Sequence, residues 1–411
     1  MKRLIILGAG TAGTMAANKL REQLDDDWEI TIVDQDETHY YQPGYLFIPF
    51  GSYAPSDVTK TKREFIPRGV NYVSATIAKL DPEADSVTLD NGTELGYDYL
   101  VIATGTHPTP SETPGLDSPE YGKTVHDFYT FEGAVALRDA LATFESGRFV
   151  INLIEMPIKC PVAPLEFAFL AEAYFTEHGK RDNVEIVYVT PLDAAFTKPV
   201  AARHLGSMFE DRKIELVPDF YLERVDAENK KLISYDEREV DYDLLVTVPV
   251  NMGATFVQEA GLGDEMNHVN VDHYTFLSTD YDNIFALGDA ANLPTSKAGS
   301  VAHFAMDVFV PNFINYVQGL PMREQFDGHA NCYIETGYNK AMLIDFNYTT
   351  EPLPGKYPIP GIGPFSLLKE TEANHWGKLM FKWMYWNMLL RGKNIPVPSH
   401  MMMAGKERGA S

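Results

Sequence analysis

The chain has only two cysteines, and each lies where a thiol could react. Cys160 stands in "EMPIKCPVAPLEF", directly after the apolar run "RFVINLI", which predicts a strand. A helix is predicted from near Pro164 to just before Gly179, because proline is favoured in a first turn and glycine after a last one. We expect the positive end of this helix to lower the thiol pKa of Cys160 and to favour the nucleophilic thiolate. A buried, inert thiol is the alternative.

Cys332 is predicted to occupy a polar turn between two apolar strands, in "HANCYIETGYNKAMLIDFNYTT". Two cysteines are too few for a disulfide scaffold or a structural zinc site, and no metal site is expected. Two isolated cysteines in unusual turns favour a redox pair over two unrelated buried thiols. Glu166 lies in the first turn of the helix after Cys160, where its carboxylate could move protons or simply cap the helix.

The elements that position these cysteines begin with a nucleotide-binding fingerprint at the N-terminus. "KRLIILGAGTAGTMAANKL" predicts a strand, a Gly8-x-Gly10-x-x-Gly13 turn and a helix whose N-terminus faces a pyrophosphate. The next strand, "WEITIVD", ends at Asp34, 21 residues beyond Gly13, where a carboxylate can bind ribose hydroxyls. A dinucleotide site is therefore predicted.

Two further apolar strands indicate which dinucleotide is bound. "YDYLVIATGT" ends in Ala-Thr-Gly, with Thr104 and Gly105, and "NIFALGDAA" ends in Gly288-Asp289. Together with the fingerprint, these segments resemble the FAD-binding half of flavoprotein reductases that have two dinucleotide domains. The resemblance implies FAD as cofactor, with Asp289 beside its ribityl–pyrophosphate region.

An internal repeat predicts a second, related fold. "YDYLV" at 97–101 recurs as "YDLLV" at 242–246, and the same offset of 145 residues brings "KRLII" onto "GRFVI". At this offset, Gly8, Gly10 and Gly13 fall on Leu153, Glu155 and Ile158. The second copy therefore lacks the phosphate-binding glycines, and we expect it not to hold NAD(P)H.

The predicted fold is α/β, with two tandem Rossmann-like domains of the glutathione-reductase type and a C-terminal domain. Residues 1–110 and 251–325 would form the FAD-binding domain in two parts. Residues 111–250 would form the second Rossmann-like domain, and residues 326–411 the C-terminal domain with an amphipathic helix.

Four segments give the chain a specific resemblance. They are "YYQPGYLFIPFG" (40–51), "KCPVAPLEF" (159–167), "ALGDAANLPTSKAGSVAHFA" (286–305) and "NCYIETG" (331–337). Together they resemble the sulfide:quinone oxidoreductases and their relative, the flavocytochrome c sulfide dehydrogenase flavoprotein. Many members have a third cysteine soon after the "ATG" strand, but "YGKTVHDFYTFEGA" (121–134) has none. This departure puts in doubt how polysulfide is handed on.

The resemblance implies that Cys160 and Cys332 bracket the flavin and form a disulfide or polysulfur bridge. Hydrosulfide would attack the bridge, leaving a persulfide on one cysteine and a thiolate that passes two electrons to FAD. Lys297 would lie by the pyrimidine edge of the flavin, where a cation stabilises the reduced ring. Tyr41 and Pro43 would line the flavin pocket.

The tail segment 374–393, "NHWGKLMFKWMYWNMLLRGK", predicts an amphipathic helix with a narrow polar stripe. The stripe consists of His375, Lys378, Lys382 and Lys393. From Lys356 onward, eight Lys and Arg residues stand against three Glu. Such a basic helix with tryptophans suits a membrane surface, with the lysines reaching the interface. A dimer interface and a helix packed on the body are the alternatives.

Composition narrows the function further. The formal charge of −24 argues against a nucleic-acid partner, because phosphates would be repelled. No run of about 20 apolar residues is present, and we expect no signal peptide, since "KRLIIL" leads directly into the glycine turn. We therefore predict a peripheral membrane flavoenzyme that oxidises sulfide or a related sulfur species and reduces membrane quinone. The sequence leaves a homo-oligomer open.

Two other functions fit parts of the sequence. A type II NADH:quinone reductase shares the fold and the amphipathic tail but needs the second glycine turn. A non-catalytic flavoprotein that binds sulfane sulfur and delivers it to a partner is favoured by the missing third cysteine.

Overall fold

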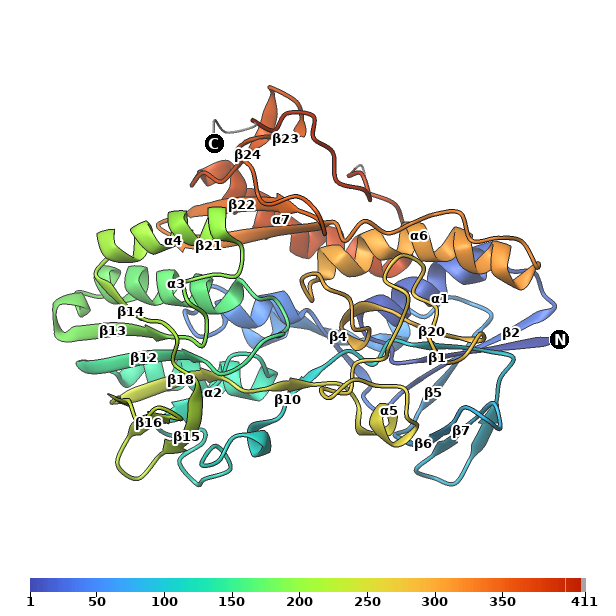
Figure 1. Ribbon diagram of the computed structural model, residues 1–411, viewed down its shortest axis with the longest axis horizontal. Helices are drawn as coiled ribbons and strands as arrows, with labels where there is room; N and C mark the ends of the chain where they lie inside the picture. The colour runs from blue at the N-terminus through green and yellow to red at the C-terminus, as the bar shows by residue number, and fades with distance from the viewer. Residues whose placement is uncertain (396, 408–411) are drawn as a thin grey trace.

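The computed structural model describes residues 1–395 and 397–407, in which two parallel sheets lie side by side (Figure 1). The first sheet has the strand order β20-β9-β1-β2-β5. Leu4 to Leu7 of β1 are buried, as expected for a parallel sheet covered on both faces. The strands are β1 (Lys2–Leu7), β2 (Trp28–Asp34), β5 (Val70–Ser74), β9 (Tyr99–Ile102) and β20 (Ile284–Ala286).

The second sheet repeats this topology with the order β11-β18-β12-β13-β14. Its strands are β11 (Val125–His126), β12 (Gly147–Leu153), β13 (Val184–Val189), β14 (Ile214–Val217) and β18 (Leu244–Val248). Each half also carries a three-stranded antiparallel sheet. These are β6 (Ile77–Asp81), β7 (Ser86–Leu89) and β8 (Glu94–Gly96), and β15 (Leu222–Asp226), β16 (Lys231–Ser234) and β17 (Glu239–Asp241). The predicted repeat and the α/β fold class are confirmed.

Helices cover both parallel sheets, and two short strand pairs complete this region. The helices are α1 (Thr11–Gln23), α2 (Phe131–Thr143), α3 (Ala163–Glu177), α4 (Pro199–Asp211), α5 (Thr255–Glu259) and α6 (Gly299–Val317). The strand pairs are β3 (Thr38–Tyr40) with β4 (Thr59–Thr61), and β10 (His107–Pro108) with β19 (Asn251–Met252). The observed α3 confirms the helix predicted between Pro164 and Gly179.

Short 3-10 turns connect several of these elements. They are η1 (Gln42–Phe47), η2 (Pro55–Val58), η3 (Lys62–Glu64), η4 (Pro110–Glu112), η5 (Arg181–Asn183), η6 (Gly288–Ala290) and η7 (Leu389–Arg391).

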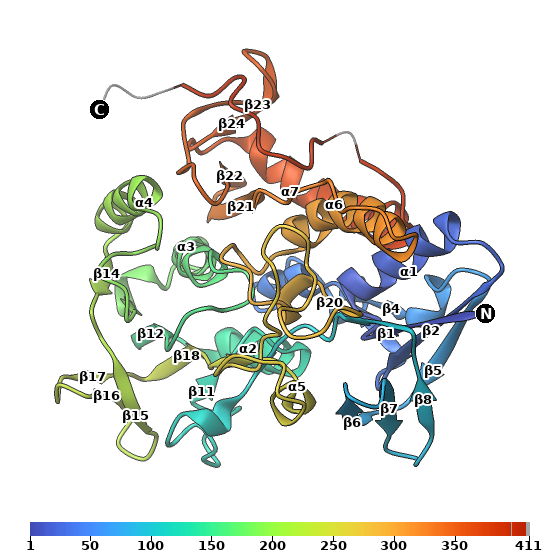
Figure 2. The ribbon, with the colours of Figure 1, turned by 45° about the vertical axis from the view of Figure 1, so that its right-hand side comes forward.

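A four-stranded C-terminal sheet and the helix α7 (Glu372–Asn387) lie on one side of both parallel sheets (Figures 1 and 2). The strands are β21 (Ala330–Gly337), β22 (Lys340–Phe346), β23 (Gly355–Ile359) and β24 (Gly363–Leu367), in the order β21-β22-β24-β23. Strand β21 packs along α3, and η7 packs on α1. The C-terminal part therefore contacts both halves of the repeat.

The orientation of α7 corrects the predicted one. The helix spans residues 372–387, not 374–393, because Met388 leaves helical geometry. Lys378 points to the body of the protein, where it pairs with Glu166 and is 12% exposed, and Tyr385 and Trp386 are buried there as well. Trp376 and Trp383 are 64% and 60% exposed. The carboxylates of Glu166 and Glu335 explain why Lys378 faces inward, because a charge that is taken out of water needs an opposite charge beside it.

No helix within the described residues is long and apolar enough to cross a membrane.

Candidate functional site

The glycine turn after β1 forms a cradle that a side chain would fill. Gly8 has φ +97°, and a Cβ there would lie 2.5 Å from the Ala103 carbonyl oxygen. A Cβ at Gly13 would lie 1.9 Å from the Gly8 carbonyl oxygen, whereas a Cβ at Gly10 would meet nothing within 4 Å. Gly8 and Gly13 thus permit close packing, and Gly10 leaves open space at the start of α1. This is the arrangement that a pyrophosphate requires.

Asp34 lies at the end of β2, beside this turn. Its Oδ2 accepts a hydrogen bond from the Ala9 amide at 2.6 Å, and its Oδ1 accepts from Lys62 Nζ at 2.5 Å. Lys62 is buried and was missed from the sequence, since a lone lysine after a short strand carries no motif. The ion pair fixes the Asp34 carboxylate at the position where ribose hydroxyls can bind.

The carboxyl ends of β9 and β20 lie together at the same edge of the sheet, since Ala286 pairs with Ile102. This brings Thr104 and Gly105 beside Gly288 and Asp289. Burial raises the pKa of Asp289, although Lys297 and Lys159 oppose the shift.

Two buried hydroxyl groups near these segments, those of Thr104 and Ser300, could form hydrogen bonds to a ligand. Within the described part of the chain, Thr104 Oγ1 and Ser300 Oγ make no hydrogen bond. Ser300 lies in the first turn of α6, whose positive end attracts negative charge. A glycine cradle, a ribose carboxylate and unpaired hydroxyls together fit a dinucleotide such as FAD.

The C-terminal helix reaches this cradle. The Tyr385 hydroxyl lies 2.7 Å from Thr11 Oγ1 and 2.7 Å from His39 Nε2. Thr11 is the first residue of α1, so α7 contacts the turn that would hold the pyrophosphate. Tyr41 is buried between Tyr385, at 5.0 Å between ring centroids, and the cysteine region, whereas Pro43 is exposed at the start of η1.

Lys297 links the cradle to Cys160. Its Nζ donates to the carbonyl oxygens of Asp289 and Ala291 at 2.8 and 3.0 Å, and burial lowers its pKa to about 8. Its own carbonyl oxygen accepts from the Cys160 amide at 2.6 Å. The loop between β12 and α3 is therefore tied to the segment that precedes α6.

Cys160 lies in the loop between β12 and α3 and Cys332 lies in β21, but the two share one environment. Cys160 has φ +45°, and its carbonyl oxygen accepts from the Tyr129 hydroxyl at 3.1 Å. Cys332 lies inside β21, opposite Ile344, and is 6% exposed, so the prediction of a turn at Cys332 is wrong. Both thiols are free. The charges of Glu166 and Lys378 act on both cysteines, and Cys160 acts on Cys332.

The expected lowering of the Cys160 pKa is also wrong. Burial raises the pKa of Cys160 to about 12, and the Glu166 carboxylate raises it further, while Lys378 opposes both. Burial likewise raises the pKa of Cys332. Cys160 precedes α3, which begins at Ala163, but desolvation of a thiolate outweighs the partial charge at that helix end. A base is needed to deprotonate either thiol.

Glu166 is suited to be that base. It is fully buried, and its Oε2 pairs with Lys378 Nζ and accepts from the Glu335 amide at 3.3 Å. Burial raises the pKa of Glu166 to about 7, although Lys378 opposes the shift. Its Oε1 has no hydrogen-bond partner within the described residues. One carboxylate oxygen is thus held, and the other is free to exchange a proton near neutral pH.

Two more charged groups complete this cluster. Burial alone would lower the pKa of Lys378, but the carboxylates of Glu166 and Glu335 outweigh burial and raise it. Glu335 in turn contacts His375 Nδ1 at 2.9 Å. From the sequence, His375 and Lys378 were assigned to the polar stripe of a helix at the membrane surface. Residues three apart lie on the same side of a helix, so His375 and Lys378 could both face the acidic "IETG" segment. Nothing in the sequence, however, places that segment beneath the helix.

Comparisons with known proteins show which flavoproteins the chain is similar to. Residues 2–151 match the family model described as pyridine nucleotide-disulphide oxidoreductase. The mitochondrial sulfide:quinone oxidoreductase of Dictyostelium discoideum is 28% identical over 95% of this chain and 86% of its own length. The mouse mitochondrial enzyme of the same name is 26% identical over the same shares.

A solved structure shows the same fold. The sulfide:quinone oxidoreductase of Aquifex aeolicus superposes with a TM-score of 0.81 and 20% identity, covering 96% of this chain and 92% of that one. The resemblance predicted from the sequence and the prediction of FAD are confirmed. The chain is therefore an FAD-dependent oxidoreductase that is similar over 95% of its length to the sulfide:quinone oxidoreductases and, at residues 2–151, to the pyridine nucleotide-disulphide oxidoreductase family model.

Proposed function

We propose that this enzyme oxidises sulfide, or a related inorganic or persulfide sulfur species, and passes the electrons to a membrane quinone. Cys160 and Cys332 act as its redox pair, and sulfane sulfur or polysulfide is the product. The observation that carries the proposal is the shared environment of the two cysteines. Both are subject to the charges of the same ion pair, Glu166 with Lys378.

The sulfur chemistry balances with the groups that are present. Hydrosulfide attacks a Cys160–Cys332 disulfide, so that one cysteine becomes a persulfide and the other leaves as a thiolate. A second hydrosulfide attacks the persulfide, releasing HSSH and a second thiolate. The two thiolates re-form the bridge and give up two electrons. FAD, when bound, supplies the two-electron acceptor, and quinone takes the electrons from it.

The chain's own residues assist these steps through charge. Lys378 stabilises a thiolate at either sulfur, because it is cationic and its charge acts on both cysteines. Glu166 receives the proton of a cysteine that has taken one up, which returns that sulfur to the thiolate form needed to re-form the bridge, and its pKa near 7 lets it release the proton again.

The loop between β12 and α3 argues against NADH as the donor. It contains no glycine, and two of its backbone amides already have partners. The Cys160 amide donates to the Lys297 carbonyl oxygen, and the Lys159 amide donates to Asn251 Oδ1 at 3.2 Å. A pyrophosphate at this place would need free amides at a helix start. We infer that this half of the repeat positions a thiol instead of a nicotinamide.

Anaerobic stopped-flow absorbance of the holoenzyme tests the proposal. We expect sulfide, but not NADH, to bleach the flavin band, and a soluble quinone to restore it over repeated cycles. Sulfide that leaves the flavin oxidised would refute the proposal. Bleaching without recovery on adding quinone would favour the non-catalytic sulfur-binding alternative, and bleaching by NADH would favour the type II reductase.

The exposed side of α7 is the surface that we propose for membrane contact. Trp376, Met380 and Trp383 are 64%, 51% and 60% exposed at successive turns of the helix. Burying a large apolar side chain contributes roughly 1.5–3 kcal/mol, so three together can hold a protein at a lipid surface. Contact here would bring quinone to the helix that also carries Lys378 and Tyr385.

Replacing these three residues by serine is expected to weaken membrane binding. We expect the triple variant to bind zwitterionic lipid vesicles at least about tenfold less tightly in a sedimentation assay, with FAD content and reduction by sulfide retained. Tyr235→Ser is the matched control, because Tyr235 is 75% exposed on the distant β16–β17 turn. Equal binding by the triple variant would refute the surface, and a change from dimer to monomer would assign it to self-association.

Deletion of the tail would not test this surface. It would also remove Lys378 from Glu166 and Tyr385 from Thr11, and so would disturb the site itself.

A further inference from the structure

We propose that Arg212 is a positioning residue that sets the separation of Cys160 and Cys332. This inference rests on the proposed redox pair. The two cysteines belong to different layers of the structure, since Cys160 precedes α3 and Cys332 lies in β21 of the C-terminal sheet. Their separation therefore depends on how β21 packs along α3.

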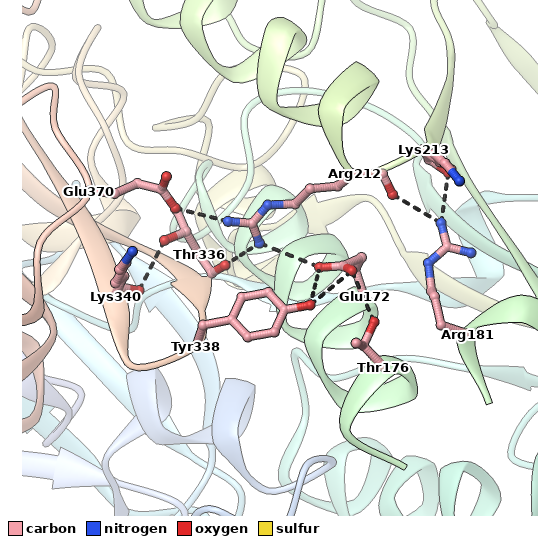
Figure 3. A network of polar contacts seen from close by, with 9 residues as sticks. All are labelled: Glu172, Thr176, Arg181, Arg212, Lys213, Thr336, Tyr338, Lys340 and Glu370. Atoms are coloured by element: carbon pink, nitrogen blue, oxygen red, sulfur yellow. Dashed lines mark hydrogen bonds and ion pairs between the residues drawn. The ribbon is translucent and has the colours of Figure 1, made fainter. Parts of the chain in front are cut away.

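The distance requirement is narrow. A disulfide needs Cα atoms about 4.4–6.8 Å apart, whereas one residue of a strand rises about 3.3 Å. A slide of β21 by less than one residue along α3 would take the pair out of range. Something must hold this register, and Figure 3 shows a polar network that does so at the far end of the two elements.

The network is centred on the guanidinium of Arg212, at the end of α4. It donates to the Thr336 carbonyl oxygen in β21 and to Glu370 Oε1 at 2.9 Å, and it lies 3.6 Å from Glu172 Oε2 in α3 (Figure 3). The side chain is 16% exposed. One planar cation thus joins α4, α3 and the C-terminal sheet, a task for which the five donors of arginine are suited.

Packing around Arg212 makes this contact specific. Its guanidinium lies 5.0 Å from the Phe169 ring and 5.5 Å from the Tyr338 ring. The Tyr338 hydroxyl donates to Glu172 at 3.0 Å, so the β21–β22 turn is held to α3 twice. A Cβ at Gly337 would lie 2.6 Å from Ala173 Cβ, so the turn is already as close to α3 as glycine allows.

Strand β21 and helix α3 run alongside each other in the same direction. Glu166 meets Glu335 near the start of α3, and Ala173 meets Gly337 further along it. Cys160 and Cys332 both lie before these contacts in sequence, at the opposite end from Arg212. The Arg212 network therefore acts on the cysteines through the register of β21 on α3, without touching either sulfur.

Equilibration of the holoenzyme with glutathione buffers tests this role. The reaction is Cys160 thiol plus Cys332 thiol plus oxidised glutathione, giving the disulfide and two reduced glutathione molecules. Alkylation and mass spectrometry measure the disulfide fraction, and hence the effective concentration of one thiol at the other. We expect Arg212→Met to lower this effective concentration tenfold or more, and Arg212→Lys to recover part of the loss, because it keeps the charge but not the fork.

Arg238→Met is the matched control. Arg238 donates to the carbonyl oxygens of Pro218 and Asp219, both within the half of the repeat that contains the second sheet. It therefore loses backbone hydrogen bonds of the same kind without touching Arg212 or β21, and we expect less than a twofold change. Should Arg212→Met not fold, Glu370→Gln removes only the partner in the C-terminal part and should give a smaller loss in the same direction.

The outcomes separate this inference from the proposed function. An unchanged effective concentration in the Arg212 and Glu370 variants, or a wild-type pair that never forms a disulfide, would overturn the inference. A wild-type pair that equilibrates normally in an enzyme that sulfide cannot reduce would overturn the proposed function and leave the role of Arg212 standing.

Discussion

Replacing either cysteine by alanine should abolish reduction of the flavin by sulfide. We expect Cys160→Ala and Cys332→Ala each to slow anaerobic bleaching of the flavin band by at least about a thousandfold, because the attacked disulfide needs both sulfurs. FAD should remain bound, since the glycine cradle and Asp34 involve neither thiol. Stopped-flow absorbance gives the rate, and the FAD-to-protein ratio gives the occupancy.

The double variant sharpens this test. Residues that act as one unit give losses that do not add, so the double variant should be no slower than either single variant. Reduction by dithionite is the control, because it bypasses the cysteines and should be equal in all forms. Loss of FAD in both single variants would mean that the cysteines are structural, and undiminished bleaching would place the entry of electrons elsewhere.

The fold could be predicted almost entirely from the sequence. The Gly8-x-Gly10-x-x-Gly13 turn and the 145-residue offset depend on local spacing, and the observed strand orders of the two sheets repeat as the offset requires. Glycine patterns of this kind can be recognised in a sequence because only glycine lets the backbone approach so closely.

The candidate site was less predictable because its charges meet across the chain. Lys378 follows Glu166 by 212 residues, and the charges of both residues act on the two thiols. The helix periodicity placed His375 and Lys378 correctly on one face of α7, but it could not say which face is buried. A polar stripe is ordinarily taken to be solvated, and here the buried carboxylates reverse that rule.

The prediction of a lowered pKa for Cys160 failed for the same reason, because the groups that surround the thiol are far from it in the sequence. The start of α3 could be predicted and suggested a lowered pKa, whereas the desolvation of the Cys160 thiol by the folded protein could not be predicted. Desolvation is a property of the folded surroundings, and it outweighs the local helix end. A reactive thiol at this position consequently depends on a base, which makes Glu166 the most informative residue to change after the cysteines.

Glu166→Gln is expected to slow sulfide-driven bleaching about a hundredfold at pH 8, in the range typical of a lost general base. The pKa of Glu166 is raised to about 7, so the wild-type carboxylate is ionised at pH 8 and mostly protonated at pH 6. The ratio of wild-type to variant rates should therefore fall about tenfold from pH 8 to pH 6. Using this ratio removes the ionisation of sulfide itself, which affects both enzymes equally.

The Lys378→Met variant tests whether the Glu166 carboxylate acts as a base or has only a structural role. Lys378 holds the pKa of Glu166 down against burial, so its removal should move the pH dependence of bleaching to higher pH. Lys382→Met is the matched control on the same helix, because Lys382 lies over the Tyr53 ring at 3.8 Å and pairs with no carboxylate within the described residues. It should leave the pH profile unchanged. A ratio of wild-type to Glu166→Gln rates that stays flat with pH, or an Lys378→Met profile that does not move, would show that Glu166 carries no proton in the reaction and serves only to anchor α7.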